Sequence, residues 1–186
     1  MKRVVDITLS SLGLLFLLPL MCLIAAAILI NSKGPALYWS LRVGCNNTKF
    51  KMPKFRTMSI KAPELATHLL DNPDKWITSI GHFLRRTSLD ELPQLWSILR
   101  GDMSIVGPRP ALFNQYDLIA LRTSKGLHRL TPGLTGWAQV NGRDDLSVAQ
   151  KVDLDLQYMR LRTIRLDFRI MFMTLIRFLK RSGVSH

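Results

Sequence analysis

The chain has 186 residues and lacks the features that define several common classes of protein. Two cysteines, Cys22 and Cys45, are too few for a disulfide scaffold or for a zinc site built from cysteines. The four histidines lie far apart in the sequence, without the spacing of metal ligands. No repeat of about 20–50 residues is present, and neither is a Walker lysine motif, a kinase motif set or a nucleophile elbow. These absences exclude a solenoid and the enzyme classes that those motifs define.

Charged residues are missing from residues 7–32, an apolar run preceded by Lys2, Arg3 and Asp6. As one straight helix this run would be about 39 Å long, against about 30 Å for the hydrocarbon core of a bilayer. It is too long for the apolar part of a signal peptide, and no small-residue cleavage site follows it. No second run of this length exists, which excludes a polytopic transporter. We therefore expect a membrane-inserted helix in residues 1–33 and one further domain in residues 34–186.

Pro19 lies near the middle of the apolar run and predicts a kink there, because proline removes one helix hydrogen bond and clashes with the preceding turn. Basic residues flank both ends of the run, and basic flanks prefer the cytoplasmic side. A bent helix that enters and leaves on the same side (re-entrant) fits these features, and so does a single spanning helix with a tolerated proline. Both alternatives place residues 34–186 in the cytoplasm, since their flank is the more basic.

Acidic residues are scarce: the chain has 13 Asp and Glu against 26 Lys and Arg. Three of the basic residues and one acidic residue precede residue 34, so residues 34–186 keep 23 basic and 12 acidic residues and a net charge of +11. Such an excess predicts a polyanionic partner. The apolar segment favours membrane lipid or a phosphorylated substrate. We expect no nucleic acid, because aromatic residues do not interleave with glycines as they do in RNA-binding proteins.

The remaining pattern predicts an α+β fold that is mostly helical and compact. Extended segments at 36–41 and 50–56, joined by a turn at 44–47, predict a short β-hairpin. Helices are expected over 63–70, 77–86, 90–100, 111–124, 147–161 and 166–181, with Gly101 ending the third and loops at 107–110 and 131–143. Because Pro93 would fall inside the 90–100 helix, that helix can also start nearer to it.

The last predicted helix is amphipathic. One face carries Phe168, Met171, Phe172, Leu175 and Leu179, and the other carries Arg165, Arg169, Arg177, Lys180 and Arg181. Such a helix fits the lipid headgroup layer. It also fits an ordinary helix that packs its apolar face on a protein core.

Two adjacent carboxylates, Asp90 and Glu91, follow the pair Arg85-Arg86 near a predicted helix start. One interpretation is structural, because Ser88 with Glu91 matches a capping box and acidic residues suit the first turn. The other is catalytic. A helix N-terminus and two arginines would lower the carboxylate pKa and attract phosphate, an ionised aspartate can attack phosphorus, and a carboxylate pair can hold Mg²⁺.

Further cations fit a phosphate site, although each alone also fits a solvated surface residue. Lys54 and Arg56 alternate on a predicted strand. Prolines on both sides fix the backbone of Arg109, which limits the entropy that this side chain loses on binding a phosphate bidentately. Arg143 ends a glycine-rich loop.

Five blocks of sequence together resemble a known family. They are Lys2-Arg3-x-x-Asp6 and residues 54–58 (KFRTM), 87–96 (TSLDELPQLW), 101–110 (GDMSIVGPRP) and 132–143 (PGLTGWAQVNGR). In this order, and over almost the whole chain, they resemble the bacterial sugar transferase family, the monotopic phosphoglycosyl transferases, in its small single-domain form. Two departures are Ser40, where members often carry glutamine, and Leu18 before Pro19, where members often carry serine.

The resemblance implies transfer of a phosphosugar from a UDP-sugar, expected to be N-acetylated, to undecaprenyl phosphate, with release of UMP. By position, Asp90 would attack the β-phosphorus and form a covalent aspartyl-phosphosugar intermediate in a ping-pong mechanism. Glu91 would position Asp90 or assist proton transfer. Mg²⁺ would be the cofactor, with Asp90 as a ligand. Lys54, Arg85, Arg109 and Arg143 would bind phosphates.

The resemblance also favours the re-entrant helix bent at Pro19, in the bacterial inner membrane, with the catalytic domain and its interfacial helices on the cytoplasmic face. A homodimer stays open, since the last helix could pack on a second copy. Two other functions stay open as well. One is a membrane-tethered basic adaptor that binds anionic lipid or nucleic acid without catalysis. The other is a glycosyltransferase that moves the sugar without its phosphate and releases UDP.

Overall fold

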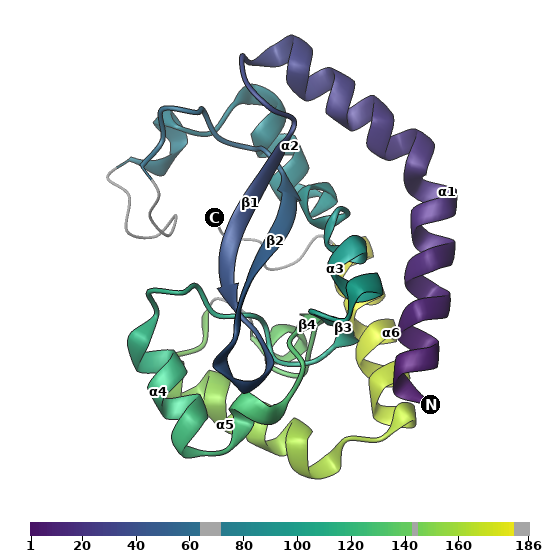
Figure 1. Cartoon of the computed structure of the whole chain (residues 1–186), viewed down its shortest axis with the longest axis vertical. Helices are drawn as coiled ribbons and strands as arrows, with labels where there is room; N and C mark the ends of the chain where they lie inside the picture. The colour runs from purple at the N-terminus through teal and green to yellow at the C-terminus, as the bar shows by residue number, and fades with distance from the viewer. Residues whose placement is uncertain (64–71, 143–144, 181–186) are drawn as a thin grey trace.

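The computed structural model describes residues 1–63, 72–142 and 145–180, which form a mostly helical α+β structure. A long helix, α1 (Lys2–Asn31), lies along one side of a body that contains two small sheets (Figure 1). The mostly helical α+β class is thus confirmed. The helix expected over 63–70 lies almost wholly outside the described residues.

The predicted hairpin is present. Strands β1 (Leu37–Val43) and β2 (Lys49–Phe55) pair antiparallel, with Leu37 opposite Phe55 and Val43 opposite Lys49. The connection contains a short 3₁₀ turn, η1 (Cys45–Asn47), in which Asn46 and Asn47 have positive φ angles of 53° and 59°. Asparagine tolerates this left-handed conformation better than most residues, so the sequence suits the turn.

Around the two carboxylates Asp90 and Glu91, the structure matches the alternative in which the helix starts near Pro93, and not the one in which it starts at residue 90. Helix α2 (Ser79–Arg86) is followed by a 3₁₀ turn, η4 (Leu89–Glu91), and then by α3 (Gln94–Arg100), which ends at Gly101 with φ 97°. The capping box is wrong, because Ser88 is left-handed (φ 52°) and its side chain makes no capping bond. Proline at position 93 lacks an N–H and suits the start of a helix, which explains why α3 begins only there.

The second half of the body surrounds a short parallel sheet of β3 (Ser104–Val106) and β4 (Gly133–Thr135). Around it lie α4 (Tyr116–Ser124), the 3₁₀ turns η5 (Leu127–Arg129) and η6 (Gln139–Asn141), α5 (Val148–Leu161) and α6 (Ile164–Lys180), while η3 (Pro73–Lys75) precedes α2. Helix α4 is shorter than expected at its start. Ser147 and Gln150 cap α5 reciprocally, so this helix begins where the sequence places it. The largest core cluster joins these elements and includes Val106, Val140, Val152 and Ile170.

Helix α6 packs on the core through Ile170, which is fully buried, with Leu166 and Met173 partly buried beside it. The apolar face identified in the sequence points elsewhere: Phe168, Phe172 and Leu175 are 51%, 63% and 54% exposed. Met171 of the same face is packed against the core, so within the described residues this face is mostly, but not wholly, exposed. Helix α6 thus meets the core mainly through a second apolar face, formed by Leu166, Ile170 and Met173.

Helix α1 is continuous through Pro19, and its ribbon bends along the side of the body (Figure 1). It packs on α3, where Gly13 faces Leu95, and in its C-terminal half Ile24 and Ile28 form a buried cluster with Phe55 and Leu84. Among the described residues it is the one helix that is long and apolar enough to cross a membrane. Many large apolar side chains along it are exposed, including Leu15, Phe16, Leu23 and Ile30.

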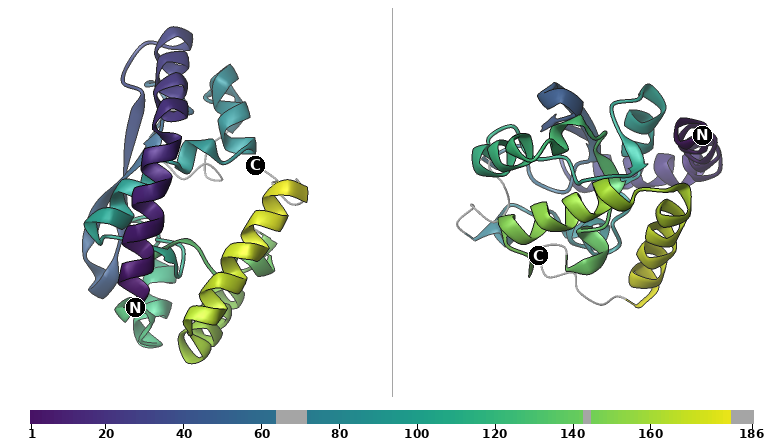
Figure 2. Two further views of the ribbon diagram at one scale, coloured as in Figure 1. Left: turned by 90° about the vertical axis from the view of Figure 1, so that its right-hand side faces the viewer. Right: turned by 90° about the horizontal axis from the view of Figure 1, so that it is seen from below.

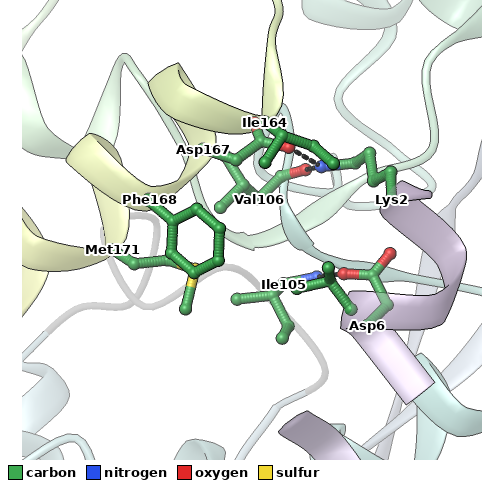
Figure 3. A pocket seen from close by; sticks show the side chains of 9 residues that line it. Lys2, Asp6, Ile105, Val106, Ile164, Asp167, Phe168 and Met171 are labelled. Atoms are coloured by element: carbon green, nitrogen blue, oxygen red, sulfur yellow. Dashed lines mark hydrogen bonds and ion pairs between the residues drawn. The ribbon is translucent and has the colours of Figure 1, made fainter. Parts of the chain in front are cut away.

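Both ends of α1 are fastened to the same body. At its start, Lys2 Nζ lies 2.6 Å from Asp167 Oδ2, and the two helices α1 and α6 diverge from this point (Figure 2). Asp6 accepts hydrogen bonds from Ser104 Oγ (2.8 Å) and the Ile105 N–H (2.9 Å) beside a small cavity (Figure 3).

The other end of α1 is held by Arg56, a buried side chain at the end of β2. Its Nη2 donates to the Ser32 carbonyl (2.9 Å) and to Ser32 Oγ (2.8 Å), and Nη1 donates to the Lys33 carbonyl. Ser32 and Lys33 follow the last helical residue, so their carbonyls have no partner within the helix, and the guanidinium supplies one. The body therefore fixes the start and the end of α1 through charged side chains.

Candidate active site

Four side chains from three elements meet at the open end of the hairpin. Lys54 comes from β2, Asp90 and Glu91 come from η4, and Arg109 follows β3. Glu91 Oε1 lies 2.8 Å from Lys54 Nζ and 2.7 Å from Arg109 Nη2, so one oxygen accepts from both cations. Lys54 Nζ is also 4.0 Å from Asp90 Oδ2. The structure thus brings together four of the residues that the sequence assigns to the site.

Glu91 is held as an anion. Burial alone would raise the pKa of Glu91, but the ion pairs with Arg109 and Lys54 outweigh it and hold this pKa well below the usual range. Burial lowers the pKa of Lys54, and Glu91 opposes that shift. In this ion pair, the charge of each group opposes the pKa shift that burial causes in the other.

Asp90 differs from its neighbour. Burial raises the pKa of Asp90 and the neighbouring Glu91 raises it further, whereas Lys54, Arg85 and Arg109 lower it and only partly offset the rise. The expectation that Arg85, Arg86 and a helix start would lower the pKa of both carboxylates is thus wrong for Asp90, and for Glu91 it is right in direction but not in cause, since Arg109 and Lys54 lower that pKa. For Asp90, the physical reason is that burial, which spacing does not reveal, exceeds the attraction of the surrounding cations. Ser88, in its left-handed conformation, sets the backbone direction two residues before Asp90.

Two further residues were predicted to bind phosphate, Arg85 and Arg143, and the structure describes only the first of them. Arg85 lies on α2, donates from Nε to Thr57 Oγ1 (2.9 Å) and is close enough to Asp90 for each to influence the other. Burial lowers the pKa of Arg85, and Asp90 opposes that shift. Arg143 lies outside the described residues, so its assignment stays a prediction.

One further cation belongs to this group and was not assigned to the site from sequence. Arg42 donates from Nε to Ser40 Oγ (2.9 Å) and from Nη1 to the Pro110 carbonyl (3.2 Å). Burial and the neighbouring Arg109 lower the pKa of Arg42 to about 10, so it stays charged at neutral pH. The hairpin register could have indicated this. Lys54 lies opposite Tyr38, and opposed residues share a face of the hairpin. Because every second residue of a strand points to the same face, Arg42 lies on the face of Tyr38 and Lys54.

The described part of the glycine-rich block, residues 132–142, supports the loop that carries Arg109. Gly107 donates its N–H to the Thr135 carbonyl, and Gly133 donates to the Pro108 carbonyl, both at 2.8 Å. A Cβ on Gly136 would lie 2.1 Å from the Gly107 carbonyl oxygen, so the two backbones touch directly. Glycine is required where backbones approach this closely.

Mg²⁺ is compatible with the donors present. The described residues contain no group of three or more histidine, cysteine or carboxylate side chains that could hold a metal alone. Mg²⁺ does not need one, since it is commonly bound by one or two carboxylates together with substrate phosphates and water. Because Glu91 already pairs with two cations, Asp90 is the better ligand of the two. The arrangement can thus hold a diphosphate beside a buried carboxylate.

Comparison with known proteins agrees with the resemblance seen in the sequence. Residues 1–181 match the family model described as bacterial sugar transferase. The undecaprenyl-phosphate glucose phosphotransferase of Komagataeibacter xylinus is 44% identical over 189 residues, which cover 95% of this chain and 35% of the relative. The UDP-glucose:undecaprenyl-phosphate glucose-1-phosphate transferase of Escherichia coli (strain K12) is 39% identical over 184 residues, or 95% of this chain and 40% of the relative.

A relative of more similar length also matches. The exopolysaccharide production protein ExoY of Rhizobium meliloti (strain 1021) is 39% identical over 190 residues, which cover 94% of this chain and 83% of that protein. By contrast, the chain spans well under half of the length of the first two relatives. The similarity to those two concerns the part that contains Asp90, Glu91 and the surrounding cations.

Proposed function

This chain belongs to the bacterial sugar transferase family, and on that premise we propose that it transfers a phosphosugar from a UDP-sugar to undecaprenyl phosphate. The observation that carries the proposal is the cluster of Lys54 and Arg109 on one oxygen of Glu91, with Asp90 beside it. Joining two anionic substrates requires cations that are already in position. A non-catalytic adaptor for polyanions would have no use for two buried carboxylates among those cations.

UDP-glucose is the donor that we propose to test first. Two of the matched relatives carry UDP-glucose or glucose and undecaprenyl phosphate in their names. The N-acetylated donor expected from the resemblance has no support in those names. The acceptor proposed for this chain is undecaprenyl phosphate, whose phosphate lies at the membrane surface.

In the proposed mechanism, an Asp90 carboxylate oxygen attacks the β-phosphorus of the UDP-sugar. A phosphorus–oxygen bond to Asp90 forms as the bond between the β-phosphorus and the bridging oxygen breaks, and UMP leaves with that oxygen. An oxygen of undecaprenyl phosphate then attacks the same phosphorus, and the carboxylate of Asp90 is regenerated. Mg²⁺, held by Asp90 and the substrate phosphates, would supply neutralising charge.

Glu91 is proposed to position the two cations rather than to move protons. Its pKa is held well below the usual range, so it stays ionised at neutral pH and carries no proton to donate. Its oxygen fixes Lys54 Nζ and Arg109 Nη2 at 2.8 and 2.7 Å before any substrate arrives. Such preorganisation removes the need to reorient charges during the reaction.

The membrane arrangement that we propose is the re-entrant one. A folded body lies on one side of a bilayer, and both Lys2 and Ser32 contact that body. A helix whose two ends are bound to the same body cannot place one end on the opposite face. The proposed location is the bacterial inner membrane, with the site on the cytoplasmic face, where UDP-sugars occur and basic flanks are favoured.

The exposed apolar face of α6 is proposed to contact lipid rather than a second copy. Phe168, Phe172 and Leu175 are exposed next to the exposed arginines Arg169 and Arg177. Basic residues beside aromatic ones suit anionic headgroups. Two copies that met through this face would bring like charges together.

The direct test of the function is product analysis with purified protein, UDP-glucose, undecaprenyl phosphate and Mg²⁺. We expect release of UMP together with an undecaprenyl diphosphate sugar. Release of UDP instead would identify a glycosyltransferase that leaves the phosphate behind. Salt-sensitive binding of anionic vesicles without any nucleotide product would support the adaptor.

Glu91→Gln should separate the role of Glu91 from that of Asp90. The amide keeps the shape but removes the charge that holds Lys54 and Arg109, so kcat/KM should fall about 100-fold, measured by UMP release. Asp102→Asn is the matched control, since it removes a carboxylate charge from a different ion pair, with Arg100 at the end of α3, and should leave kcat/KM unchanged. Unchanged kcat/KM in Glu91→Gln would remove Glu91 from the proposed machinery.

The topology can be tested by cysteine labelling in intact cells, where an impermeant maleimide reaches only the periplasmic side, and in inside-out membrane vesicles, where it reaches the cytoplasmic side. Cys22 and Cys45 are first replaced by alanine, and Val4→Cys and Lys33→Cys then report on the two exposed ends of α1. We expect an impermeant maleimide to label both positions from the cytoplasmic side only. Labelling of Val4→Cys from the periplasm alone would establish a spanning helix instead.

A further inference from the structure

A buried ion pair lies behind the arginine loop, outside the carboxylate cluster. Arg122 on α4 donates from Nη2 (2.7 Å) and Nε (3.1 Å) to the same oxygen, Oδ2, of Asp155 on α5. The side chain of Asp155 is 1% exposed and that of Arg122 is 13% exposed. Neither residue belongs to the five sequence blocks that carried the resemblance.

The third donor group of Arg122 points toward the site. Its Nη1 donates to the backbone carbonyl of Arg109 at 2.8 Å. Because residues 108 and 110 are prolines, the backbone on both sides of Arg109 has no N–H to anchor it. Of residues 108–110, only Arg109 retains a backbone N–H, so the three carbonyls are the main backbone groups through which this stretch can be held.

All three carbonyls of this stretch have donors. Gly133 N–H binds the carbonyl of Pro108 (2.8 Å), Arg42 binds that of Pro110 (3.2 Å), and Arg122 binds that of Arg109 itself. The donor to Arg109 is in turn oriented by Asp155. A chain of contacts thus runs from Asp155 through Arg122 and Arg109 to Glu91.

Stability alone explains this pair poorly. A buried ion pair is often no more stabilising than apolar side chains of the same volume, because both charges must leave water. Burial accordingly raises the pKa of Asp155 even though Arg122 opposes the shift. A paired guanidinium can also orient a hydrogen bond. Because the group is planar and rigid, binding two of its nitrogens to a carboxylate fixes the direction of the third, which a lysine ammonium cannot do.

We propose that Asp155 and Arg122 are positioning residues that set the backbone of Arg109, and through it the cation that faces Glu91. The proposal rests on the proposed function in so far as Arg109 binds the substrate diphosphate. Neither Asp155 nor Arg122 is proposed to touch a substrate. Loss of the Asp155 charge would free Arg122 and let the Arg109 loop shift.

The kinetic test uses Asp155→Asn and a control that lowers stability by another route. Asp155→Asn should raise KM for UDP-glucose about tenfold or more, with a smaller change in kcat of the folded protein, since a misplaced binding group costs up to about 100-fold. Val152→Ala removes buried methyl groups one turn earlier on α5 and should keep the wild-type KM while it lowers the unfolding temperature. Equal KM values in the two variants would overturn the proposal.

A double-mutant comparison shows whether the effect passes through Arg109. In an Arg109→Ala background, Asp155→Asn should cause little further loss in kcat/KM, because the group that it positions is gone. Arg122→Lys should behave like Asp155→Asn. Multiplicative losses in the double mutant would mean that Asp155 acts independently of Arg109 and would contradict the proposal.

Hydrogen–deuterium exchange decides the inference without any substrate. In Asp155→Asn, amides of residues 107–115 should exchange faster than in wild type, whereas those of α1 and β2 should not change. Exchange that is unchanged over 107–115, or faster throughout the protein, would overturn the positioning role. If the wild type releases no UMP, the proposed function fails, but this comparison still tests the structural link.

Discussion

Asp90→Asn is expected to abolish phosphosugar transfer, with a loss in kcat of at least about 10⁴-fold. The variant keeps the shape of the side chain and removes the ionised oxygen that would attack phosphorus. Because Asp90 is largely buried and is not an anchor of Lys54 or Arg109 at hydrogen-bond distance, the cation cluster on Glu91 should survive the change. The loss should therefore appear in turnover and not in the folding of the protein.

The measurement combines turnover with a search for the intermediate. Purified wild-type protein incubated with UDP-glucose and Mg²⁺, but without acceptor, should gain the mass of a phosphosugar, and digestion should place it on Asp90. Asp90→Asn should show no adduct while it unfolds at the wild-type temperature and still binds UDP-glucose. Asp102→Asn is again the control and should form the adduct normally. Full activity of Asp90→Asn, or an adduct on another residue, would remove Asp90 as nucleophile.

The difference between the two carboxylates explains why this prediction is specific to Asp90. Glu91 is neutralised by two cations at hydrogen-bond distance, so its oxygen is a poor nucleophile and a good anchor. Asp90 has its nearest lysine nitrogen at 4.0 Å, and burial raises its pKa. A carboxylate that is less neutralised by its neighbours retains more of its reactivity toward an incoming phosphorus.

The site was located in the sequence through the five blocks that resemble the family. The geometry shows why the spacing of the residues alone could not have located it. Lys54 and Glu91 lie 37 positions apart and meet only because β2 runs beside η4. Arg42 was missed for the same reason, since its place depends on the hairpin register rather than on a local motif. The predicted lowering of the Asp90 pKa was wrong because this pKa depends on burial, which arises from the whole fold.

Some local patterns located a helix end correctly, whereas the capping box of Ser88 and Glu91 did not. Gly101 ends α3 and Ser147 begins α5 as the sequence predicts. Local patterns also failed where tertiary packing decides. Helix α6 carries two apolar faces, and periodicity does not reveal which of them meets the core, so the face with Phe168 and Phe172 was open to both interpretations.

The second large effect is expected from a glycine that touches no carboxylate. Gly133→Ala should lower the free energy of unfolding by about 3 kcal/mol or more. A Cβ at this position would lie 2.1 Å from Gly107 N, 2.6 Å from Gly107 Cα and 2.4 Å from the Thr135 carbonyl oxygen. All three are backbone atoms, so no side chain can rotate away to make room.

The strain should also reach the site, because Gly133 donates its N–H to the Pro108 carbonyl and Arg109 is the next residue. We therefore expect both a lower unfolding temperature, by about 6–12 °C for a chain of this length, and reduced UMP release by the protein that stays folded. Gly126→Ala is the matched control. Gly126 has φ 74° but nothing within 4 Å of a Cβ, so alanine there should cost only about 1 kcal/mol of backbone strain and leave turnover unchanged.

Comparing Gly133→Ala with Gly126→Ala separates the effect of close backbone packing from the effect of replacing any glycine. If both variants lose about 1 kcal/mol, the contact between Gly107 and Gly133 is not tight enough to require glycine. If Gly133→Ala unfolds early and loses turnover while Gly126→Ala does neither to the same extent, the glycine-rich block acts as a support. In that case its task is to hold the Pro108–Pro110 stretch, so that the Arg109 side chain meets Glu91 at 2.7 Å.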